Sequence, residues 1–305
     1  MSALKRASQT LTADRALAQR LAAFEHELAR AVRERAGGPA RLGQALRYAA
    51  LSPGKRLRPL LVLTACEAVG GEWKRALPAA VAIECVHAFS LVHDDLPAMD
   101  DDDYRRGRLT THKKFGEALG VLAGDALLAF AFEELTRLGA AGLPPARIVE
   151  AVRVLGRAAG ADQLVGGQAL DIAAEGAKPT ARLVRDIHTR KTGALMGAAL
   201  ALGALAGDAG ARTVEKLQEA GVQMGFAFQI HDDLLNADSS LKTLGKRAGT
   251  DAARGKATWP GAVGEKRARA EAQRIMKTVE VAIARWCERP RLLLQLIEAT
   301  ARRER

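Results

Sequence analysis

Two acidic clusters contain the residues of this chain whose types and spacing could do chemistry. The first is Asp94-Asp95 with Asp100 a few residues on, and the second is Asp232-Asp233. Adjacent carboxylates repel each other unless a cation or water relieves the charge. Clustered oxygen donors are typical ligands of hard cations such as Mg²⁺. Two such clusters facing each other would form a cation cage, which in turn implies a substrate that carries phosphate.

The first cluster sits at the end of an apolar run that is typical of a buried helix. Pro97 interrupts this helix because proline lacks an N–H donor and clashes with the preceding turn. The resulting bulge would bring Asp100 back toward Asp94. Arg105 and Arg106 follow directly, and their planar guanidinium groups suit phosphate oxygens. Their alternative role is to neutralise the acidic run.

Other cationic and polar residues also suit phosphate binding. Lys55 and Arg58 open a predicted helix, where unpaired backbone N–H groups favour anions. His87 lies nearly two turns before Asp94 and shares its helix face, although an isolated histidine is usually structural. The remaining candidates are Gln168, Asp171, Lys191, Thr192, Gln229, Lys246 and Lys256. The last two fall in residues 236–257, a polar segment predicted to be a loop that either closes over phosphate or is simply solvated.

The composition predicts an all-α protein. Apolar residues make up 48% of the 305 residues, but aromatic residues only 4%, so the core must consist of Ala, Leu and Val. Ala and Leu favour helices, and runs typical of strands are nearly absent. Because the sequence contains no long linker, residues 1–305 are expected to form a single domain. The predicted helices are 14–34, 41–51, 57–69, 76–95, 116–139, 145–171, 180–205, 211–237, 260–285 and 289–302.

Charge and cysteine usage narrow the function classes. The net charge of +11 attracts anions, but the basic residues are spread over many helices without interleaved aromatic residues, so we expect no nucleic-acid binding. The three cysteines lack metal-ligand spacing and are typical of a reduced, cytoplasmic protein. No signal-peptide core follows the N-terminus, and the apolar segment 196–206 is too short to span a bilayer. We therefore expect no membrane insertion.

Together the motifs resemble the trans-isoprenyl diphosphate synthase family, and within it the bacterial type of farnesyl diphosphate synthase. The matching segments are 54–59, 87–107, 167–171, 191–192 and 228–256. The resemblance implies an all-α isoprenoid synthase fold, with antiparallel helices around a deep central cavity, in a homodimer. It also implies Mg²⁺-dependent, head-to-tail condensation of isopentenyl diphosphate with dimethylallyl or geranyl diphosphate. The expected products are farnesyl diphosphate and pyrophosphate.

The resemblance also assigns roles to individual residues. Three Mg²⁺ ions would be held by Asp94, Asp100, Asp171 and Asp232, with Asp95 supporting through water. The implied catalytic residues are Asp94, Asp95, Asp100, Arg105, Lys191, Asp232 and Asp233. The allylic diphosphate would be bound by Arg105, Lys191, Thr192, Gln229, Lys246 and Lys256, and Gln168 would also contact substrate. Isopentenyl diphosphate would be bound by Lys55, Arg58, His87 and Arg106.

Product length is expected to depend on Phe89 and Ser90, just before the first cluster. In the family, an aromatic residue at the position of Phe89 limits chain growth and favours a fifteen-carbon product. Alternatively, Phe89 only packs between helices. The alternative products are geranyl and geranylgeranyl diphosphate. One residue departs from the family pattern, because Asn236 stands where the second motif ends in aspartate. A neutral amide binds Mg²⁺ more weakly than a carboxylate does, so we expect lower Mg²⁺ affinity.

Three other function classes share some of these features. His93-Asp94 and His231-Asp232 could belong to a phosphohydrolase of the HD type, but further histidines in suitable positions are missing. A non-catalytic subunit of a prenyl synthase would be expected to lose the acidic motifs. In this chain Asp94, Asp100 and Asp232 remain, and only Asn236 departs from the motif pattern. A terpene cyclase has little need of the second diphosphate site that the basic residues around Lys55 would provide.

Overall fold

The computed structural model describes the backbone of residues 3–35, 38–176, 178–242 and 256–302, and the side chains of 14–35, 38–176, 178–236 and 256–300. Most of the described residues are helical, and the described strands are two of two residues each, which confirms the predicted all-α class. The chain divides into two compact units. Unit 1 comprises Met1–Val152 and Leu202–Asp208, and unit 2 comprises Arg153–Ala201 and Ala209–Arg305. Helices α7 (Pro145–Ala159) and α10 (Ala194–Ala206) cross the boundaries between them.

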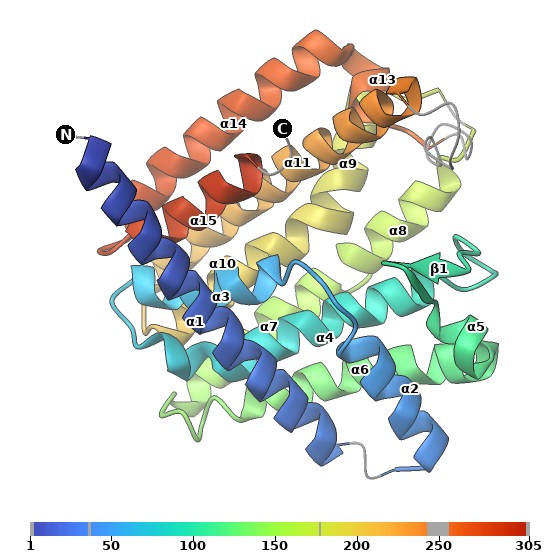
Figure 1. Ribbon diagram of the computed structural model, residues 1–305, viewed down its shortest axis with the longest axis horizontal. Coiled ribbons are helices and arrows are strands. Elements are labelled where there is room, and N and C mark those ends of the chain that lie inside the picture. Colours follow the sequence, from blue (N-terminus) through green and yellow to red (C-terminus); the bar gives the residue numbers. More distant parts are fainter. Residues whose placement is uncertain (1–2, 36–37, 177, 243–255, 303–305) are drawn as a thin grey trace. The chain divides into compact units, whose positions relative to one another are not determined.

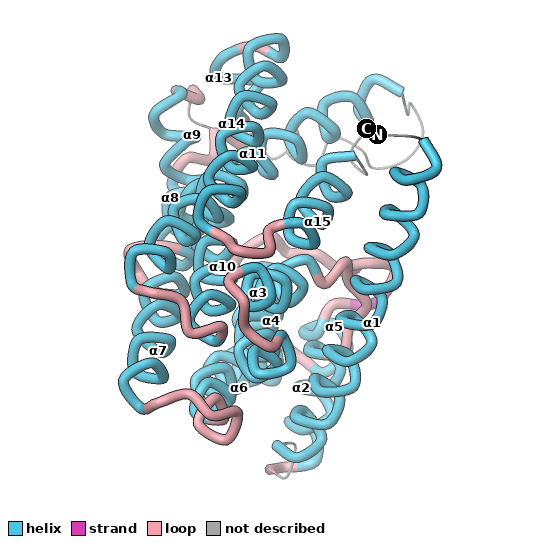
Figure 2. The backbone as a smooth tube through the Cα atoms, turned by 90° about the vertical axis from the view of Figure 1, so that its left-hand side faces the viewer, coloured by secondary structure: helices cyan, strands magenta, loops and turns pink. Residues whose placement is uncertain are grey.

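Helix α4 (Leu77–Asp94) forms the centre of unit 1. Its sequence is apolar all round, which is typical of a helix buried on every side, and most of its side chains are buried. Figure 2 shows it surrounded by the other long helices of the unit, which contact it. These are α1 (Ala3–Arg35), α2 (Ala40–Ala50), α3 (Leu57–Ala68) and α6 (Glu117–Thr136). Because α4 is held in this way, the polar residues near its C-terminal end have a rigid support.

The short helix η1 (Trp73–Ala76) and α4 together form the segment Trp73–Asp94, which is long and apolar enough to cross a membrane. Within the protein, however, 67% of the apolar window is buried. The core helix of a soluble protein has the same length and composition. The apolarity of α4 is therefore accounted for by its position in the core of unit 1.

Unit 2 is built around α11 (Ala211–Lys242), which packs along α14 (Glu265–Trp286) (Figure 1). The other elements of this unit are α8 (Leu164–Ala173), α9 (Ala181–His188), the π-helical turn η2 (Thr189–Gly193), α13 (Trp259–Val263) and α15 (Arg291–Arg302). Glycines let α11 and η2 touch at their backbones. A Cβ on Gly225 would lie 2.6 Å from the Cα of Gly193, closer than real Cβ contacts come.

Five predicted elements differ from those observed. The helix predicted over 14–34 already begins at Ala3. The helix predicted over 145–171 is broken at residues 160–163 into α7 and α8. The helix predicted over 180–205 contains the π-turn η2, and the one predicted over 260–285 is interrupted at Gly264, where φ is +84°. The loop predicted from residue 236 is wrong up to Lys242, because α11 continues to that point. Residues 243–255 lie outside the described part of the chain.

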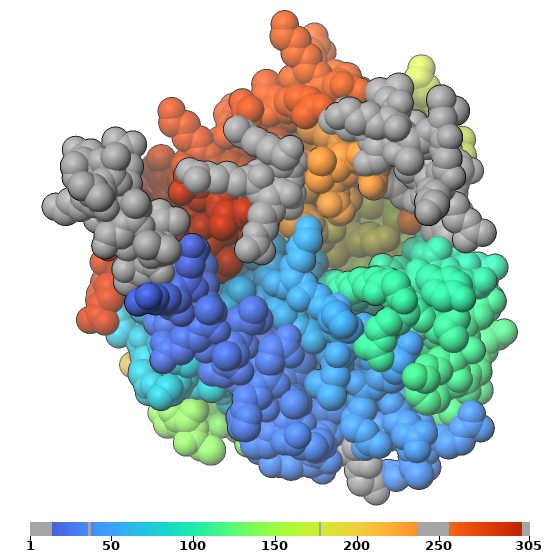
Figure 3. All heavy atoms as spheres, viewed as in Figure 1, coloured from blue at the N-terminus to red at the C-terminus, as the bar shows by residue number. Residues whose placement is uncertain are grey.

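The sequence also failed to predict a small hairpin and a short helix after the first acidic cluster. Strands β1 (Tyr104–Arg105) and β2 (Arg108–Leu109) pair antiparallel, and α5 (Thr111–Phe115) follows them. Strands of two residues are too short to show the alternating pattern that identifies a strand in a sequence. On the face shown in Figure 3, the hairpin and α5 (green) lie beside α2 (blue), which α5 contacts.

We expect Gly225→Ala to lower the free energy of unfolding by about 1–3 kcal/mol, since the added methyl group meets backbone that must move. Urea unfolding followed by circular dichroism measures this change. Gly38→Ala is the matched control, because a Cβ there meets nothing within 4 Å. Equal stability of the two variants would show that α11 and η2 are not held at backbone contact.

Candidate active site

The first acidic cluster folds back on itself where α4 ends. Asp94 is the last residue of the helix. The N–H of Asp100 donates to the carbonyl oxygen of Asp94 at 2.8 Å, and the N–H of Asp101 donates to the carbonyl oxygen of Leu96 at 3.1 Å. The predicted turn after Pro97 is therefore confirmed at the level of the backbone. It brings Asp94 and Asp100 to the same end of α4 although they are six residues apart.

Asp95 is in a different environment from its neighbour Asp94. Its side chain is buried, whereas Asp94 is half-buried. The Nε of Arg105 donates to Asp95 Oδ1 at 2.6 Å. Burial raises the pKa of Asp95 to about 6, and the Arg105 guanidinium opposes that rise. Asp95 thus ties the hairpin to the end of α4.

The hairpin fixes two consecutive arginines. Its turn is Arg106-Gly107, with φ of 53° and 75°, and positive φ at both positions is typical of the type I′ turns that join twisted strands. Arg105 reaches Asp95, while Arg106 donates to the carbonyl oxygen of Pro53. The hydroxyl of Tyr48 donates to the carbonyl oxygen of Leu109 at 2.8 Å and holds the second strand against α2. Neither this role of Tyr48 nor the turn was predicted from the sequence.

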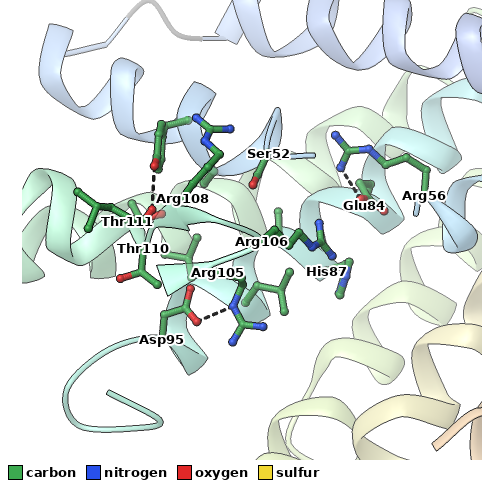
Figure 4. A pocket seen from close by; sticks show the side chains of 16 residues that line it. Ser52, Arg56, Glu84, His87, Asp95, Arg105, Arg106, Arg108, Thr110 and Thr111 are labelled. Atoms are coloured by element: carbon green, nitrogen blue, oxygen red, sulfur yellow. Dashed lines mark hydrogen bonds and ion pairs between the residues drawn. The ribbon is translucent and has the colours of Figure 1, made fainter. Parts of the chain in front are cut away.

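A pocket in unit 1 opens between α2, the hairpin and α4 (Figure 4). The ionisable residues that line it are mostly basic, namely Arg56, His87, Arg105, Arg106 and Arg108, beside Glu84, Asp95 and Tyr48. The two carboxylates are already paired. Glu84 accepts from Arg56 at 2.7 Å, and Asp95 accepts from Arg105. The lining therefore carries more positive charge than its own acids offset, and it suits an anionic ligand.

Arg56 is a structural residue that the sequence analysis did not single out. It precedes α3 with φ of 49° and is 5% exposed. It donates to Glu84 and, at 2.8 Å, to Glu25. A buried guanidinium is stable only when it is paired in this way. The two predicted binding residues, Lys55 and Arg58, lie next to it in the sequence. Lys55 is exposed, and Arg58 is half-buried.

Arg58 and His87 lie close enough in this part of unit 1 for the charge of Arg58 to act on His87. Within the described part of the chain, the Nε of Arg58 is buried without a hydrogen-bond partner. Burial lowers the pKa of His87 well below 6.5, and nearby arginines, Arg58 and Arg106 foremost, lower it further. Figure 4 shows Arg106 pointing toward His87. A bound anion would offset the repulsion that keeps His87 neutral.

Unit 2 holds a second group of predicted site residues. Lys191 Nζ lies 2.8 Å from Asp171 Oδ2, and Lys256 Nζ lies 3.9 Å from the same oxygen. Gly167 permits this arrangement, because a Cβ there would lie 2.4 Å from the backbone nitrogen of Lys191. Gln168 is 8% exposed, and its Oε1 has no hydrogen-bond partner among the described residues. Two lysines thus meet at one carboxylate.

A chain of hydrogen bonds runs from η2 to α11 in the same unit. Thr192 Oγ1 donates to Gln229 Oε1 at 3.0 Å, and Gln229 Nε2 donates to Asp233 Oδ1 at 3.3 Å. Asp233 is buried, whereas Asp232 is half-buried and Asn236 is exposed. Consecutive residues of a helix point about 100° apart. The two carboxylates of the second cluster therefore face different surroundings.

The donor types fit Mg²⁺, a hard cation that prefers carboxylate oxygens. Of the predicted ligands, Asp94 and Asp100 belong to unit 1, and Asp171 and Asp232 belong to unit 2. Among the residues that the structure describes, no group of three or more His, Cys, Asp or Glu side chains could hold a metal ion by itself. The metal assignments therefore stay predictions.

The predicted chain-length residues lie beside the pocket rather than in its lining. Phe89 is 6% exposed, and its ring packs edge-on against His93 with 5.1 Å between the ring centroids. Ser90 Oγ donates to the carbonyl oxygen of His87. His93 Nε2 lies 3.0 Å from the carbonyl oxygen of Val121, so this imidazole is used in helix packing. Lys246 lies outside the described residues.

We expect His87 to stay neutral below pH 6.5 in the ligand-free protein. Since its pKa is lowered on folding, the unfolded chain takes up the proton first, and stability is lost as the pH falls below 6.5. The free energy of unfolding of the wild type should therefore decrease relative to that of His87→Gln between pH 7.5 and 5. Urea unfolding at several pH values tests this, and imidazole NMR shifts report the pKa directly. An imidazole that titrates at 6.5 or above would contradict it.

Comparison with known proteins identifies the family. Residues 39–285 match the family model described as "Polyprenyl synthetase". The chain is 42% identical over 250 residues to the farnesyl diphosphate synthase of Geobacillus stearothermophilus (82% of this chain, 84% of that protein). It is 45% identical over 242 residues to geranylgeranyl pyrophosphate synthase 11, chloroplastic, of Arabidopsis thaliana (78% and 68%).

A solved structure agrees with this identification. The FPP/GFPP synthase from Zymomonas mobilis is 34% identical to this chain and superimposes with a TM-score of 0.83, covering 95% of this chain and 99% of that one. Its match and that of the family model extend over residues of both units. The chain therefore belongs to the polyprenyl synthetase family, has the all-α isoprenoid synthase fold, and is a prenyltransferase.

Proposed function

We propose that this chain is a farnesyl diphosphate synthase, with residues 1–305 forming one isoprenyl diphosphate synthase domain. It would condense isopentenyl diphosphate with dimethylallyl and then geranyl diphosphate. The observation that carries the proposal is the pair of cationic groups, one around His87 in unit 1 and one around Asp171 in unit 2. A reaction between two diphosphates needs two anion sites. The relatives named above include a farnesyl and a geranylgeranyl diphosphate synthase, so the product length is part of the proposal.

In the proposal, the unit 1 pocket binds isopentenyl diphosphate. Arg58, His87 and Arg106 supply donors, and Lys55 adds charge from the exposed turn before α3. Arg106 is positioned by its hydrogen bond to Pro53, which Gly54 permits because a Cβ there would overlap the guanidinium. Guanidinium groups bind phosphate oxygens in a bidentate manner. The excess of cations over acids in the lining supports this assignment.

The unit 2 group would bind the allylic diphosphate. Lys191 and Lys256 both approach Asp171, and Thr192, the chain neighbour of Lys191, donates a hydrogen bond to Gln229. Arg105 and Lys246 complete the proposed set, and Gln168 contributes its amide. These residues would take up the negative charge that builds on the departing diphosphate as the allylic C–O bond breaks.

Asp94, Asp100, Asp171 and Asp232 would hold Mg²⁺, with Asp95 supporting through water. When bound, Mg²⁺ supplies positive charge that stabilises the leaving diphosphate. The chain's own residues orient the two substrates so that the alkene of isopentenyl diphosphate attacks the allylic carbon. A proton is then lost to the diphosphate. Apolar surroundings exclude the water that would otherwise capture the carbocation.

A cytoplasmic homodimer is part of the same proposal. Helix α6 leaves Val121 and Leu122 41% and 50% exposed, and large apolar side chains at neighbouring exposed positions are typical of an interface. Analytical ultracentrifugation would give the mass of the assembly.

Incubation of the purified chain with Mg²⁺, labelled isopentenyl diphosphate and dimethylallyl diphosphate tests the function. We expect a fifteen-carbon product, and no product after removal of Mg²⁺ by EDTA. In Arg106→Met, we expect the KM for isopentenyl diphosphate to rise about tenfold or more, because a charged hydrogen bond is lost. Arg147→Met is the matched control, because Arg147 pairs with Asp208 and does not line the pocket. A folded chain that makes no prenyl product would overturn the proposal, whereas a ten- or twenty-carbon product would overturn only the chain length.

We expect Phe89→Ala to lengthen the main product beyond fifteen carbons, because the side chain that limits growth is shortened. Chromatography of the dephosphorylated products measures the change. Phe130→Ala, which empties a buried aromatic position on α6, controls for general loosening of unit 1. An unchanged product length in Phe89→Ala would show that Phe89 only packs against His93.

A further inference from the structure

The second acidic cluster contains one carboxylate that the protein itself uses. Asp233 is 4% exposed. Its Oδ2 accepts the backbone N–H of Trp259 at 2.8 Å, and its Oδ1 accepts the side-chain amide of Gln229 at 3.3 Å. A buried carboxylate with a partner on each oxygen is stabilised where it lies. Its neighbour Asp232, half-buried on another side of α11, is in a different environment.

Trp259 is anchored from three directions. Its side chain is 2% exposed and packs edge-on against Phe226, with 4.9 Å between the ring centroids. The guanidinium of Arg185 lies over both rings, 4.5 Å from Phe226 and 5.1 Å from Trp259, and pairs with Glu271 at 2.6 Å. Trp259 is also the first residue of α13, where backbone N–H groups have no acceptor within the helix. Asp233 supplies the acceptor that Trp259 needs.

This anchor lies close to a residue that would bind the allylic diphosphate. Lys256 precedes Trp259 by three residues, so its Cα can be no more than about 11 Å from that of Trp259. Its Nζ lies 3.9 Å from Asp171 Oδ2, the oxygen that Lys191 also approaches. Through Gln229, Asp233 is linked to Thr192, the neighbour of Lys191. One carboxylate is therefore bonded to Trp259, which lies three residues after Lys256, and through Gln229 is linked to Thr192, the neighbour of Lys191.

We propose that Asp233 is a positioning residue, which holds Lys256 and the Thr192–Gln229 pair in place for the allylic diphosphate and does not ligate Mg²⁺. This inference rests on the proposed function, since it concerns the residues assigned to that substrate. It divides the second acidic motif into two roles. In this division, Asp232 would ligate Mg²⁺, and Asp233 would hold the protein's own residues in place.

Three variants separate the positioning role from a metal-binding one. In Asp233→Asn, the amide oxygen can still accept the Trp259 N–H, and Gln229 can turn over so that its oxygen accepts the new amide while its NH₂ donates to Thr192. We therefore expect Asp233→Asn to keep the wild-type half-saturating Mg²⁺ concentration. Asp233→Ala leaves the buried N–H of Trp259 and the half-buried amide of Gln229 without this acceptor. It should raise the KM for the allylic diphosphate about tenfold or more, while the KM for isopentenyl diphosphate changes less than twofold. Asp232→Asn is the matched metal-site control, and its half-saturating Mg²⁺ concentration should rise.

A fluorescence measurement tests the anchor without any activity. The chain has three tryptophans, and replacing Trp73 and Trp286 by phenylalanine leaves Trp259 as the reporter. We expect Asp233→Ala to shift its emission to the red and increase quenching by acrylamide, whereas Asp233→Asn and Asp232→Ala leave both unchanged. The proposal would be overturned if Asp233→Asn needed more Mg²⁺ than the wild type, as is expected of Asp232→Asn. Unchanged Trp259 emission in folded Asp233→Ala would also overturn it. If the wild type made no prenyl product, the proposed function would fail, but the fluorescence result would still decide whether Asp233 anchors Trp259.

Discussion

The burial of α4 is the constraint on which unit 1 depends. This helix is apolar on every side, so it is stable in water only when α1, α2, α3 and α6 cover it. Polar residues occur mainly near its C-terminal end, where His87 and the first acidic cluster emerge from the covered part. A helix packed on all sides cannot easily shift or tilt, because cores are packed as densely as organic crystals. His87, which would meet substrate, and Asp94, which would hold Mg²⁺, are therefore carried on a helix whose side chains are mostly buried.

Charge pairing determines which residues of the site are left for a ligand. Buried ions are costly unless they have partners, and the acids of the unit 1 pocket are matched one to one with arginines. Glu84 pairs with Arg56 and Asp95 with Arg105. What remains around His87 is cationic, and burial together with this cationic field lowers the pKa of the imidazole. The same principle operates in unit 2, where Lys191 pairs with Asp171. Binding of a diphosphate would replace part of these internal pairings by stronger ones to the ligand.

Close backbone contact is the equivalent constraint in unit 2. Gly167, Gly193 and Gly225 let α8, η2 and α11 approach until their backbones touch. Side chains of residues next to these backbone contacts are brought within hydrogen-bonding distance of one another. Thr192 therefore reaches Gln229, and Lys191 reaches Asp171. The π-turn that contains Thr192 adds a residue to the helix at this point, a distortion that is frequent at functional sites.

Sequence alone determined the all-α class, most helix positions and the return of Asp100 toward Asp94, because these follow from local preferences: helix propensity, apolar periodicity and the proline. Its motifs also resembled one family, which the comparison with known proteins identified. The hairpin, the break at residues 160–163 and the extension of α11 to Lys242 escaped it, since two-residue strands and helix ends carry weak local signals. Only the tertiary structure decided that Arg56 is an internal partner of Glu84, and that Asp95 and Asp233 face the protein while their neighbours Asp94 and Asp232 are half-buried. Adjacent aspartates look identical in a sequence. What distinguishes them is the direction in which the helix points each one and the partner, distant in the chain, that it meets there.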